Sequence, residues 1–246
     1  MKLLLMFSLF STFFGAGQHT RPACTEASFA APQGGEVVIT PINHGSLAIS
    51  YQGFEIQVDP VADYYGTTID YSAFPKADLI LVTHEHTDHM DPVAIAGLSK
   101  AGTRVFCNPG AAEELASAEV MENGDSKTVA GISVKAVPAY NISPGHTKFH
   151  PKGHGNGYVL GIGGLTVYVA GDTEDIPELS ALKDIDVALL PANQPYTMTV
   201  EQCIKAAKTI SPKTLIPYHL GETDIEAIKT GLEGSGIEVI LFEKLR

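Results

Sequence analysis

Cysteine and basic residues are scarce in this sequence, and each scarcity excludes a class of protein. The three cysteines, Cys24, Cys107 and Cys203, lie far apart, match no zinc-knuckle spacing and predict small buried or idle thiols. Sixteen Lys and Arg residues stand against 28 Asp and Glu residues, for a formal net charge of −12. Because no basic stretch is present to release phosphate counterions, we expect no binding to nucleic acid or anionic lipid.

The remaining composition is that of a folded globular protein. Hydrophobic residues make up 44% and charged residues 18% of the 246 residues, which allows a substantial core and argues against extensive disorder. This length suits one large domain or two fused small ones. Acidity alone does not exclude a phosphorylated substrate, because bound metal ions would reverse the local field.

Residues 1–17 have the pattern of a secretory signal peptide. Lys2 precedes an apolar run of roughly 12 residues, and the small residues Gly15-Ala16-Gly17 follow it. The run is too short for a comfortable membrane span of about 20 residues. We therefore predict export, periplasmic or secreted, with no stable membrane span after cleavage following Gly17. An uncleaved anchor or a buried helix is the alternative.

Residues 18–35 are small and polar, contain Pro and Gly, show no periodicity and predict a linker. The predicted folded domain, 36–246, begins with short apolar runs separated by turn residues, which are typical of strands. The residues Gln52-Gly53 predict a hairpin turn between two of these strands. The continuous apolar run Leu79-Ile80-Leu81-Val82 predicts a strand that is buried on both faces.

Strands and helices alternate in the rest of the domain. Asp91-Pro92 opens a predicted helix to about Lys100, with Asp at the N-cap and Pro at the first helical position. Further helices are expected at about 110–118, 199–210 and 223–232, the first with Asn108 as its cap and the second with Thr199. The expected strands are 37–40, 47–51, 54–58, 79–82, 104–107, 127–129, 132–137, 158–162, 165–170, 187–190, 214–216 and 237–242. This order predicts an α/β (α+β) fold of mixed sheets covered by helices.

Four potential metal ligands lie within six positions directly after the strand at 79–82, in His84-Glu85-His86-Thr87-Asp88-His89. His84 and His86 project to the same side of an extended chain, whereas Asp88 and His89 follow a turn and can face a second point nearby. Neutral imidazole and carboxylate suit zinc and its first-row neighbours. Two divalent ions about 3.5–4 Å apart can share a hydroxide whose pKa they lower. A solvated polar loop is the alternative.

Two further candidate ligands also follow predicted strands. The strand at 165–170 ends in Gly171-Asp172-Thr173, and the strand beginning at Thr214 ends in His219. Strand ends converge on one rim of a covered sheet, which is a usual position for binding sites. Taken singly, a turn former is the favoured interpretation of Asp172 and a buried core residue that of His219. Together with the histidine-rich loop they predict a single metal centre.

The loop His84-x-His86-x-Asp88-His89 matches in full the signature loop of the metallo-β-lactamase superfamily, and the resemblance extends from about Glu36 to the C-terminus. Four further segments resemble the branch that contains ascorbate-6-phosphate lactonase and many metal-dependent hydrolases. They are Asn156-Gly157-Tyr158, Gly171-Asp172-Thr173, Leu189-Leu190-Pro191 and Pro217-Tyr218-His219. The resemblance implies a four-layered αββα sandwich with the site along one edge of its two sheets.

The resemblance also implies how the ligands are divided between the two metal ions. It assigns His84, His86 and a later histidine to the first ion, Asp88, His89 and His219 to the second, and Asp172 to a bridge between them. The later histidine is His150 or His154. We favour His150, because its His-Pro-Lys-Gly setting resembles the branch pattern.

Two more residues enter through the same resemblance. It places His44 on the pocket wall, and it gives Asp59 the role of supporting a metal-binding histidine from behind. For Asp59, a simple turn before Pro60 is an equal alternative. Loops around Tyr64-Tyr65-Gly66 and Gln194-Pro195-Tyr196 are candidate contributors to the pocket.

Departures from the relatives narrow the function. Asp172 stands where the best-known zinc β-lactamases have Cys, which argues against antibiotic hydrolysis. His86 stands where the iron-dependent oxidoreductase branch has an acidic residue, which argues against redox chemistry. We predict an exported hydrolase that holds two divalent ions, Zn²⁺ before Mn²⁺ or Fe²⁺, and acts on a small-molecule ester or lactone, with Asp88 orienting the hydroxide. A small-molecule phosphodiesterase and a non-catalytic metal-binding protein are the alternatives.

Overall fold

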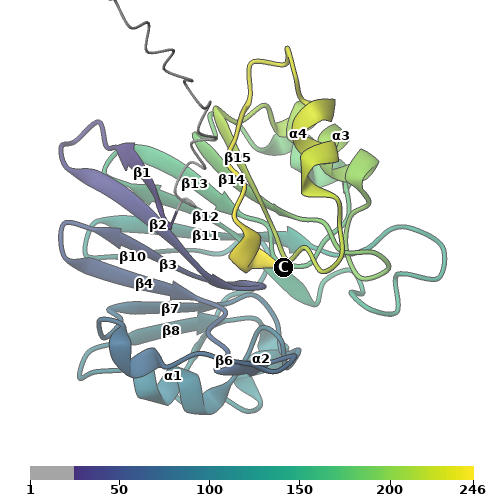
Figure 1. Ribbon diagram of the computed structural model, residues 1–246. Helices are drawn as coiled ribbons and strands as arrows, with labels where there is room; N and C mark the ends of the chain where they lie inside the picture. The colour runs from purple at the N-terminus through teal and green to yellow at the C-terminus, as the bar shows by residue number, and fades with distance from the viewer. Residues whose placement is uncertain (1–24) are drawn as a thin grey trace, which may run out of the picture.

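The computed structural model describes residues 25–246. The predicted signal peptide and the first part of the predicted linker lie outside these residues, as does Cys24. Two seven-stranded sheets pack against each other, and helices cover their outer faces (Figure 1). The predicted α/β sandwich with four αββα layers is therefore confirmed. In the described part of the chain, no helix combines the length and apolar character needed to cross a membrane.

The first sheet has the order β1-β2-β3-β4-β7-β8-β9. Its strands are β1 (Ala27–Ala30), β2 (Glu36–Asn43), β3 (Ser46–Tyr51), β4 (Phe54–Val58), β7 (Leu79–Val82), β8 (Arg104–Cys107) and β9 (Glu119–Val120). β1 to β4 pair antiparallel, and the predicted hairpin turn is present, with both Gln52 and Gly53 at positive φ. From β4 onward the strands run parallel.

The second sheet repeats this plan in the order β10-β11-β12-β13-β14-β15-β16. Its strands are β10 (Ser126–Val129), β11 (Ile132–Ala139), β12 (Gly155–Ile162), β13 (Leu165–Val169), β14 (Val187–Pro191), β15 (Thr214–Tyr218) and β16 (Glu238–Val239). β10 to β13 are antiparallel and β13 to β16 parallel. A separate small hairpin, β5 (Asp63–Tyr64) and β6 (Thr67–Thr68), leaves the first sheet after β4.

Strand β7 shows how the layers are held together. Its alternate residues Leu79 and Leu81 join the core between the two sheets, whereas Ile80 and Val82 join a second cluster with helix α1 (Pro92–Leu98). All four side chains are fully buried, as the uninterrupted apolar run predicts. Burying each such side chain stabilises the fold by about 1.5–3 kcal/mol before entropy costs.

The helices begin where the sequence predicts. Asp91 caps α1 by accepting hydrogen bonds from the backbone of Val93 and Ala94. Thr199 and Gln202 form a reciprocal capping box at the start of α3. The remaining helical elements are α2 (Pro109–Ala112), α3 (Val200–Ile210) and α4 (Ile225–Gly231), with 3₁₀ turns η1 (Tyr71–Ala73), η2 (Pro177–Ala181) and η3 (Glu243–Leu245).

Three predicted elements need correction. The predicted linker 18–35 contains strand β1, which adds to the edge of the first sheet through pairing with β2. Four residues are too few to show a strand pattern in the sequence, and the hydrogen bonds to β2 define the strand. The helix expected over 110–118 ends at Ala112 because the chain turns into β9. The last strand shrinks from 237–242 to β16, which pairs with β15 over two positions. Cys107 and Cys203 are buried free thiols, as predicted.

Candidate metal centre

The predicted ligands come from both sheets and meet at one edge of the sandwich. The loop 84–89 follows β7 of the first sheet, whereas Asp172 and His219 follow β13 and β15 of the second. Gly171 brings Asp172 close to the other strands, because a Cβ atom at Gly171 would lie 2.5 Å from the Asn156 carbonyl oxygen. Gly171 also has a φ of 65°, which favours glycine. The backbone conformation at Gly171 therefore places the Asp172 carboxylate at the edge of the sandwich where the other ligands lie.

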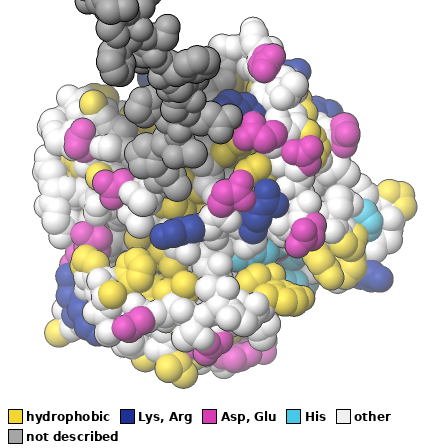
Figure 2. Space-filling view, in the orientation of Figure 1, with side chains coloured by type: hydrophobic (Ala, Val, Ile, Leu, Met, Phe, Trp, Pro, Cys, Tyr) yellow, Lys and Arg dark blue, Asp and Glu magenta, His cyan; other side chains and the backbone are white. Residues whose placement is uncertain are grey.

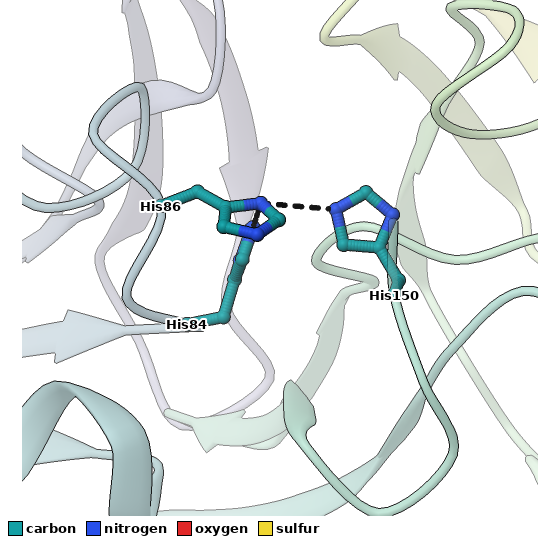
Figure 3. Close-up of side chains that lie close together, drawn as sticks. All are labelled: His84, His86 and His150. Carbon is teal, nitrogen blue, oxygen red and sulfur yellow. Dashed lines mark hydrogen bonds between the residues drawn. The ribbon is translucent and has the colours of Figure 1, made fainter. Parts of the chain in front are cut away.

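One group of ligands consists of His84, His86 and His150 (Figure 3). The His86 Nδ1 atom lies 3.0 Å from Nε2 of His84 and 3.3 Å from Nε2 of His150. Two nitrogen ligands about 2.1 Å from a shared zinc ion at a tetrahedral angle lie roughly 3.4 Å apart. The spacing of these three nitrogens therefore fits a single bound cation.

Asp172 lies between this group and the other histidines. Its Oδ2 atom is 3.2 Å from Nε2 of His150 and 3.2 Å from Nε2 of His219, and its Oδ1 atom is 3.3 Å from Nε2 of His89. The carboxylate thus touches imidazoles that the sequence analysis assigned to both ions. Asp172 therefore lies in contact with three of the candidate ligands.

Asp88 contacts a second set of imidazoles. Its Oδ2 atom lies 3.4 Å from Nε2 of His219, 3.6 Å from Nε2 of His44 and 3.8 Å from Nε2 of His89. The structure brings together all seven residues predicted as ligands and adds His44, which the sequence analysis placed only on the pocket wall. His44 also stacks on Tyr64, with ring centroids 4.2 Å apart.

Several polar atoms at this centre are buried without a hydrogen bond of suitable geometry, although some lie near one another. They are Nε2 of His89, Oδ1 of Asp172, and both ring nitrogens of His44 and of His219. Burying such atoms unsatisfied is costly, and native proteins rarely tolerate a cluster of them. A divalent cation would satisfy imidazole nitrogens and carboxylate oxygens together. The residues present therefore fit a metal site.

The far ring nitrogens of three histidines are held by the protein. The Nδ1 atom of His84 lies 3.0 Å from Thr83 Oγ1, and that of His150 lies 3.0 Å from the Tyr196 carbonyl oxygen. The Nδ1 atom of His89 lies 2.7 Å from Asp59 Oδ2. Each contact leaves Nε2 directed toward the cluster, which is how metal-binding imidazoles are oriented. The predicted contact of Asp59 with a histidine is present.

The structure distinguishes the two candidates for the later histidine. His150 is buried and belongs to the first group, whereas the His154 side chain is exposed and belongs to no ligand group among residues 25–246. His154 lines a separate surface cavity near Glu85 and Asn108. His146 is turned toward Glu174, with Nδ1 and Oε1 3.1 Å apart.

Burial and neighbouring charges set the protonation states of the ligands. Burial and the neighbouring His89 hold the pKa of His84 well below its usual value, so this imidazole is neutral. Burial raises the pKa of Asp172, but His219 and His89 outweigh it and hold the pKa well below its usual value. The pKa of His89 is lowered by burial and raised more strongly by Asp172 and Asp88, so a cation would have to displace its proton.

Three residues around the centre adopt a left-handed backbone conformation. His44, Asp59 and His219 have φ values of 48°, 45° and 50°, in a region that residues other than glycine adopt uncommonly. Each follows or joins a strand at the metal edge, and the conformation re-aims its side chain. Residues with such backbone conformations are often found at functional sites, but no sequence pattern predicts them here.

A cleft of about 290 Å³ opens over the ligands. Its walls include Tyr64, Tyr65 and Tyr196, from the two loops that the sequence analysis proposed as contributors. Phe149 and Asn193 also line it. Neither Phe149 nor Asn193 is predicted from the sequence, because neither belongs to a ligand motif and their loops show no periodic pattern.

This fold and this cluster define a metal-dependent hydrolase of the metallo-β-lactamase superfamily. The family model described as a beta-lactamase superfamily domain matches residues 38–219, and the chain belongs to this family.

Known relatives carry the same description. A UPF0173 metal-dependent hydrolase of Pelotomaculum thermopropionicum is 34% identical over 178 residues, which cover 65% of this chain and 76% of the relative. The crystal structure of a protein from Parabacteroides distasonis, described as a metal-dependent hydrolase, is 51% identical with a TM-score of 0.85, covering 89% of this chain and 98% of that one. The metallo hydrolase Igni18 of Ignicoccus hospitalis is 25% identical with a TM-score of 0.71, covering 85% and 96%.

Proposed function

We propose that this protein holds two divalent metal ions and uses them to hydrolyse a small, uncharged ester or lactone. The observation that carries the proposal is the convergence of eight His and Asp side chains with buried, unsatisfied donor atoms. When bound, the ions would supply Lewis acidity and a water of lowered pKa. Zn²⁺ suits this donor set best, and Mn²⁺ or Fe²⁺ is the alternative.

The donor atoms divide into two neighbouring sets. We assign the first ion to His84, His86 and His150, the second to Asp88, His89 and His219, and the bridge to Asp172. His44 is within 3.6 Å of Asp88 and is an additional candidate for the second set. Thr83, Asp59 and the Tyr196 carbonyl hold the imidazoles in orientation from behind.

Asp88 is the residue we place closest to the reaction. Its side chain lines the cleft and remains 26% exposed, whereas the Asp172 side chain is almost fully buried. Burial raises the pKa of Asp88, but His89, His219 and His44 outweigh it and lower that pKa. An ionised carboxylate lining the cleft can orient a water molecule, whereas its lowered pKa makes it a weak proton acceptor.

The charge of the cleft favours a carbonyl substrate over a phosphoester. Among the described residues that line the cleft over the ligands there is no Lys or Arg. Proteins that recognise phosphate groups usually add Arg, Lys or a helix N-terminus to any metal. A neutral ester or lactone needs no such partner. The same acidity supports a small molecule rather than a nucleic acid as the substrate.

Metal analysis and a substrate panel test the proposal together. We expect two metal ions per purified chain, with turnover of esters or lactones that a chelator abolishes and added zinc or manganese restores. A phosphodiester such as bis(4-nitrophenyl) phosphate serves as the rival substrate. If the protein remains inert toward every substrate after metal reconstitution, the hydrolase proposal fails and a non-catalytic metal-binding role replaces it.

A matched pair of variants locates the chemistry. Asp88→Ala should abolish turnover while the circular dichroism spectrum stays native. Glu85→Gln is the control, because Glu85 lies in the same loop but its carboxylate contacts Asn108 outside the ligand groups. Equal activity of both variants would remove Asp88 from the mechanism. Export is a separate proposal, tested by the N-terminal sequence of the mature protein recovered from its native cell.

A further inference from the structure

A second cavity of about 430 Å³ adjoins the cleft over the ligands. The two share a waist of four residues, Tyr64, Tyr65, Asn193 and Tyr196. Figure 2 shows histidine side chains at the surface between two groups of hydrophobic side chains. The cleft and this adjoining cavity, which we together call the groove, thus lie side by side next to the metal ligands.

Aromatic rings stand on two elements around this groove. On the β5–β6 hairpin, Tyr64 stacks on His44, and its ring centroid lies 4.6 Å from that of Tyr65. On the loops of the second sheet, the rings of Phe149 and Tyr196 meet edge to face with centroids 5.1 Å apart. Rings on both elements can contact the faces of a flat group that enters between them.

Tyr65 occupies a position that folding alone does not favour. It is the first residue of the two-residue turn of the β5–β6 hairpin, with a φ of 44°, and Gly66 follows with a φ of 79°. Such turns favour Asn, Asp or Gly, because larger residues are strained there by about 1 kcal/mol. The Tyr65 side chain is 92% exposed, so no core packing offsets this strain. A contact between the Tyr65 ring and a bound ligand would explain why tyrosine stands at this strained position.

The basic side chain among the described lining residues of the groove is already engaged in an ion pair. Arg246 is the one basic side chain that lines the second cavity. Its Nε atom donates to Glu243 at 2.6 Å, and its Nη1 atom donates to the carbonyl oxygens of Gly221 and Thr223. Glu222 adds a carboxylate to the wall. An anionic substrate tail would meet repulsion here rather than a partner.

We propose that the natural substrate is an uncharged ester or lactone whose acyl part carries a flat ring, held at the waist between Tyr65 and Tyr196. This inference rests on the proposed hydrolase function. The carbonyl carbon would lie over the metal ligands, and the ring would extend toward the second cavity. In the reaction the water oxygen bonds to the acyl carbon, the bond from that carbon to the alkoxy oxygen breaks, and a water proton passes to the departing alkoxide.

Methyl esters with a constant leaving group isolate the contribution of the acyl part. The metal-loaded protein is assayed by pH-stat with methyl acetate, methyl phenylacetate and the monomethyl ester that carries a 4-carboxylate on the phenylacetyl ring. We expect kcat/KM to be about tenfold higher for methyl phenylacetate than for methyl acetate, as burial and stacking of one ring allow. The carboxylate should remove most of that gain.

Variants at the waist test the two rings. Tyr65→Ala and Tyr196→Ala should each reduce the preference for methyl phenylacetate over methyl acetate about threefold or more, mainly through KM. Tyr65→Phe keeps the ring and should keep the preference. Val93→Ala, at an exposed residue on α1 outside the groove, should leave all rates unchanged.

The outcomes separate this inference from the proposed function. If the metal-loaded protein hydrolyses esters without a preference for the ring, or prefers the carboxylated ester, the inference is overturned and the hydrolase function stands. An unchanged preference in both alanine variants overturns it as well. If no ester is hydrolysed at all, the proposed function itself is lost.

Discussion

The Nδ1 atom of His89 lies 2.7 Å from the Asp59 carboxylate, and both side chains are fully buried. The backbone N–H and the hydroxyl of Thr83 also donate to Asp59, each at 2.7 Å. Burial raises the pKa of Asp59, and His89 and Thr83 partly offset that rise. With its Nδ1 atom held in this way, His89 presents Nε2 to the metal cluster.

Replacement of Asp59 should therefore weaken metal binding without removing a ligand. We expect Asp59→Ala to reduce metal affinity about 10- to 100-fold, as loss of such supporting carboxylates does elsewhere. Competition with a chromophoric chelator measures this change. Glu233→Ala, at an exposed carboxylate, is the control. An affinity equal to that of the wild type would show that His89 keeps its orientation unaided.

Glu174 holds the loop that carries His150. One carboxylate oxygen of this buried side chain accepts hydrogen bonds from the backbone of Ile142 at 2.8 Å and Ser143 at 2.6 Å. The other lies 3.1 Å from His146 Nδ1. Burial raises the pKa of Glu174, but these donors outweigh it and lower that pKa, so the group is ionised.

Glu174→Ala should destabilise the protein and loosen the loop. Because it removes charge-assisted hydrogen bonds to buried donors, we expect a loss of at least about 2 kcal/mol in urea unfolding. Faster amide exchange should be confined to residues 141–150. Glu178→Ala is the control, since its contacts with Lys152 and the Tyr140 hydroxyl are partly exposed and together cost less to lose. Equal losses in the two variants would contradict this role.

An ion-pair cluster links the edges of the two sheets and should make the free energy of unfolding depend on pH. Arg104 of β8 and Lys127 of β10 both contact Glu119 of β9, at 2.6 and 3.1 Å. The hydrogen bond from Arg104 lowers the pKa of Glu119 to about 2. Because the pKa of Glu119 is lowered on folding, its ionised carboxylate stabilises the folded protein at pH values above the ordinary pKa of 4.5. This stabilisation is lost as the pH falls toward 2.

Glu119→Gln should therefore lower the free energy of unfolding at pH 7 by a modest amount, below about 1 kcal/mol for such an exposed group. The difference from the wild type should shrink as the pH falls from about 4.5 toward 2. Urea titrations across this range measure it. A constant difference at every pH would show that packing, rather than charge, is lost.

A pair of glycine substitutions tests the close packing of the second sheet. A Cβ atom at Gly157 would lie 2.7 Å from the carbonyl oxygen of Ala170, two residues before Asp172. Gly157→Ala should cost about 1–3 kcal/mol in unfolding free energy. In contrast, a Cβ atom at the exposed Gly97 of α1 would meet open space, and Gly97→Ala should stabilise the protein by up to about 1 kcal/mol. Thermal unfolding at one metal concentration compares them, and equal shifts would refute the steric argument.

Local sequence patterns predicted much of the fold and of the candidate site. The helix caps at Asp91, Asn108 and Thr199 depend on hydrogen bonds between a side chain and the backbone two or three residues away. The local sequence is therefore enough to predict them. The buried strand β7 is visible as an apolar run, and the loop after it concentrates four ligands. Asp172 and His219 could be added because strand ends converge in any sheet of this kind.

Other features depend on contacts between distant segments, and only the folded chain reveals them. Strand β1 exists because β2 offers it an edge, and His150 rather than His154 faces the ligands because the 141–150 loop is anchored on Glu174 and Tyr196. The approach of His44 to Asp88 and the aromatic groove likewise join separate elements. The sequence by itself determined which side chains can bind a cation; the tertiary structure decided which of them meet, because distances between remote residues are set by packing and not by local conformation.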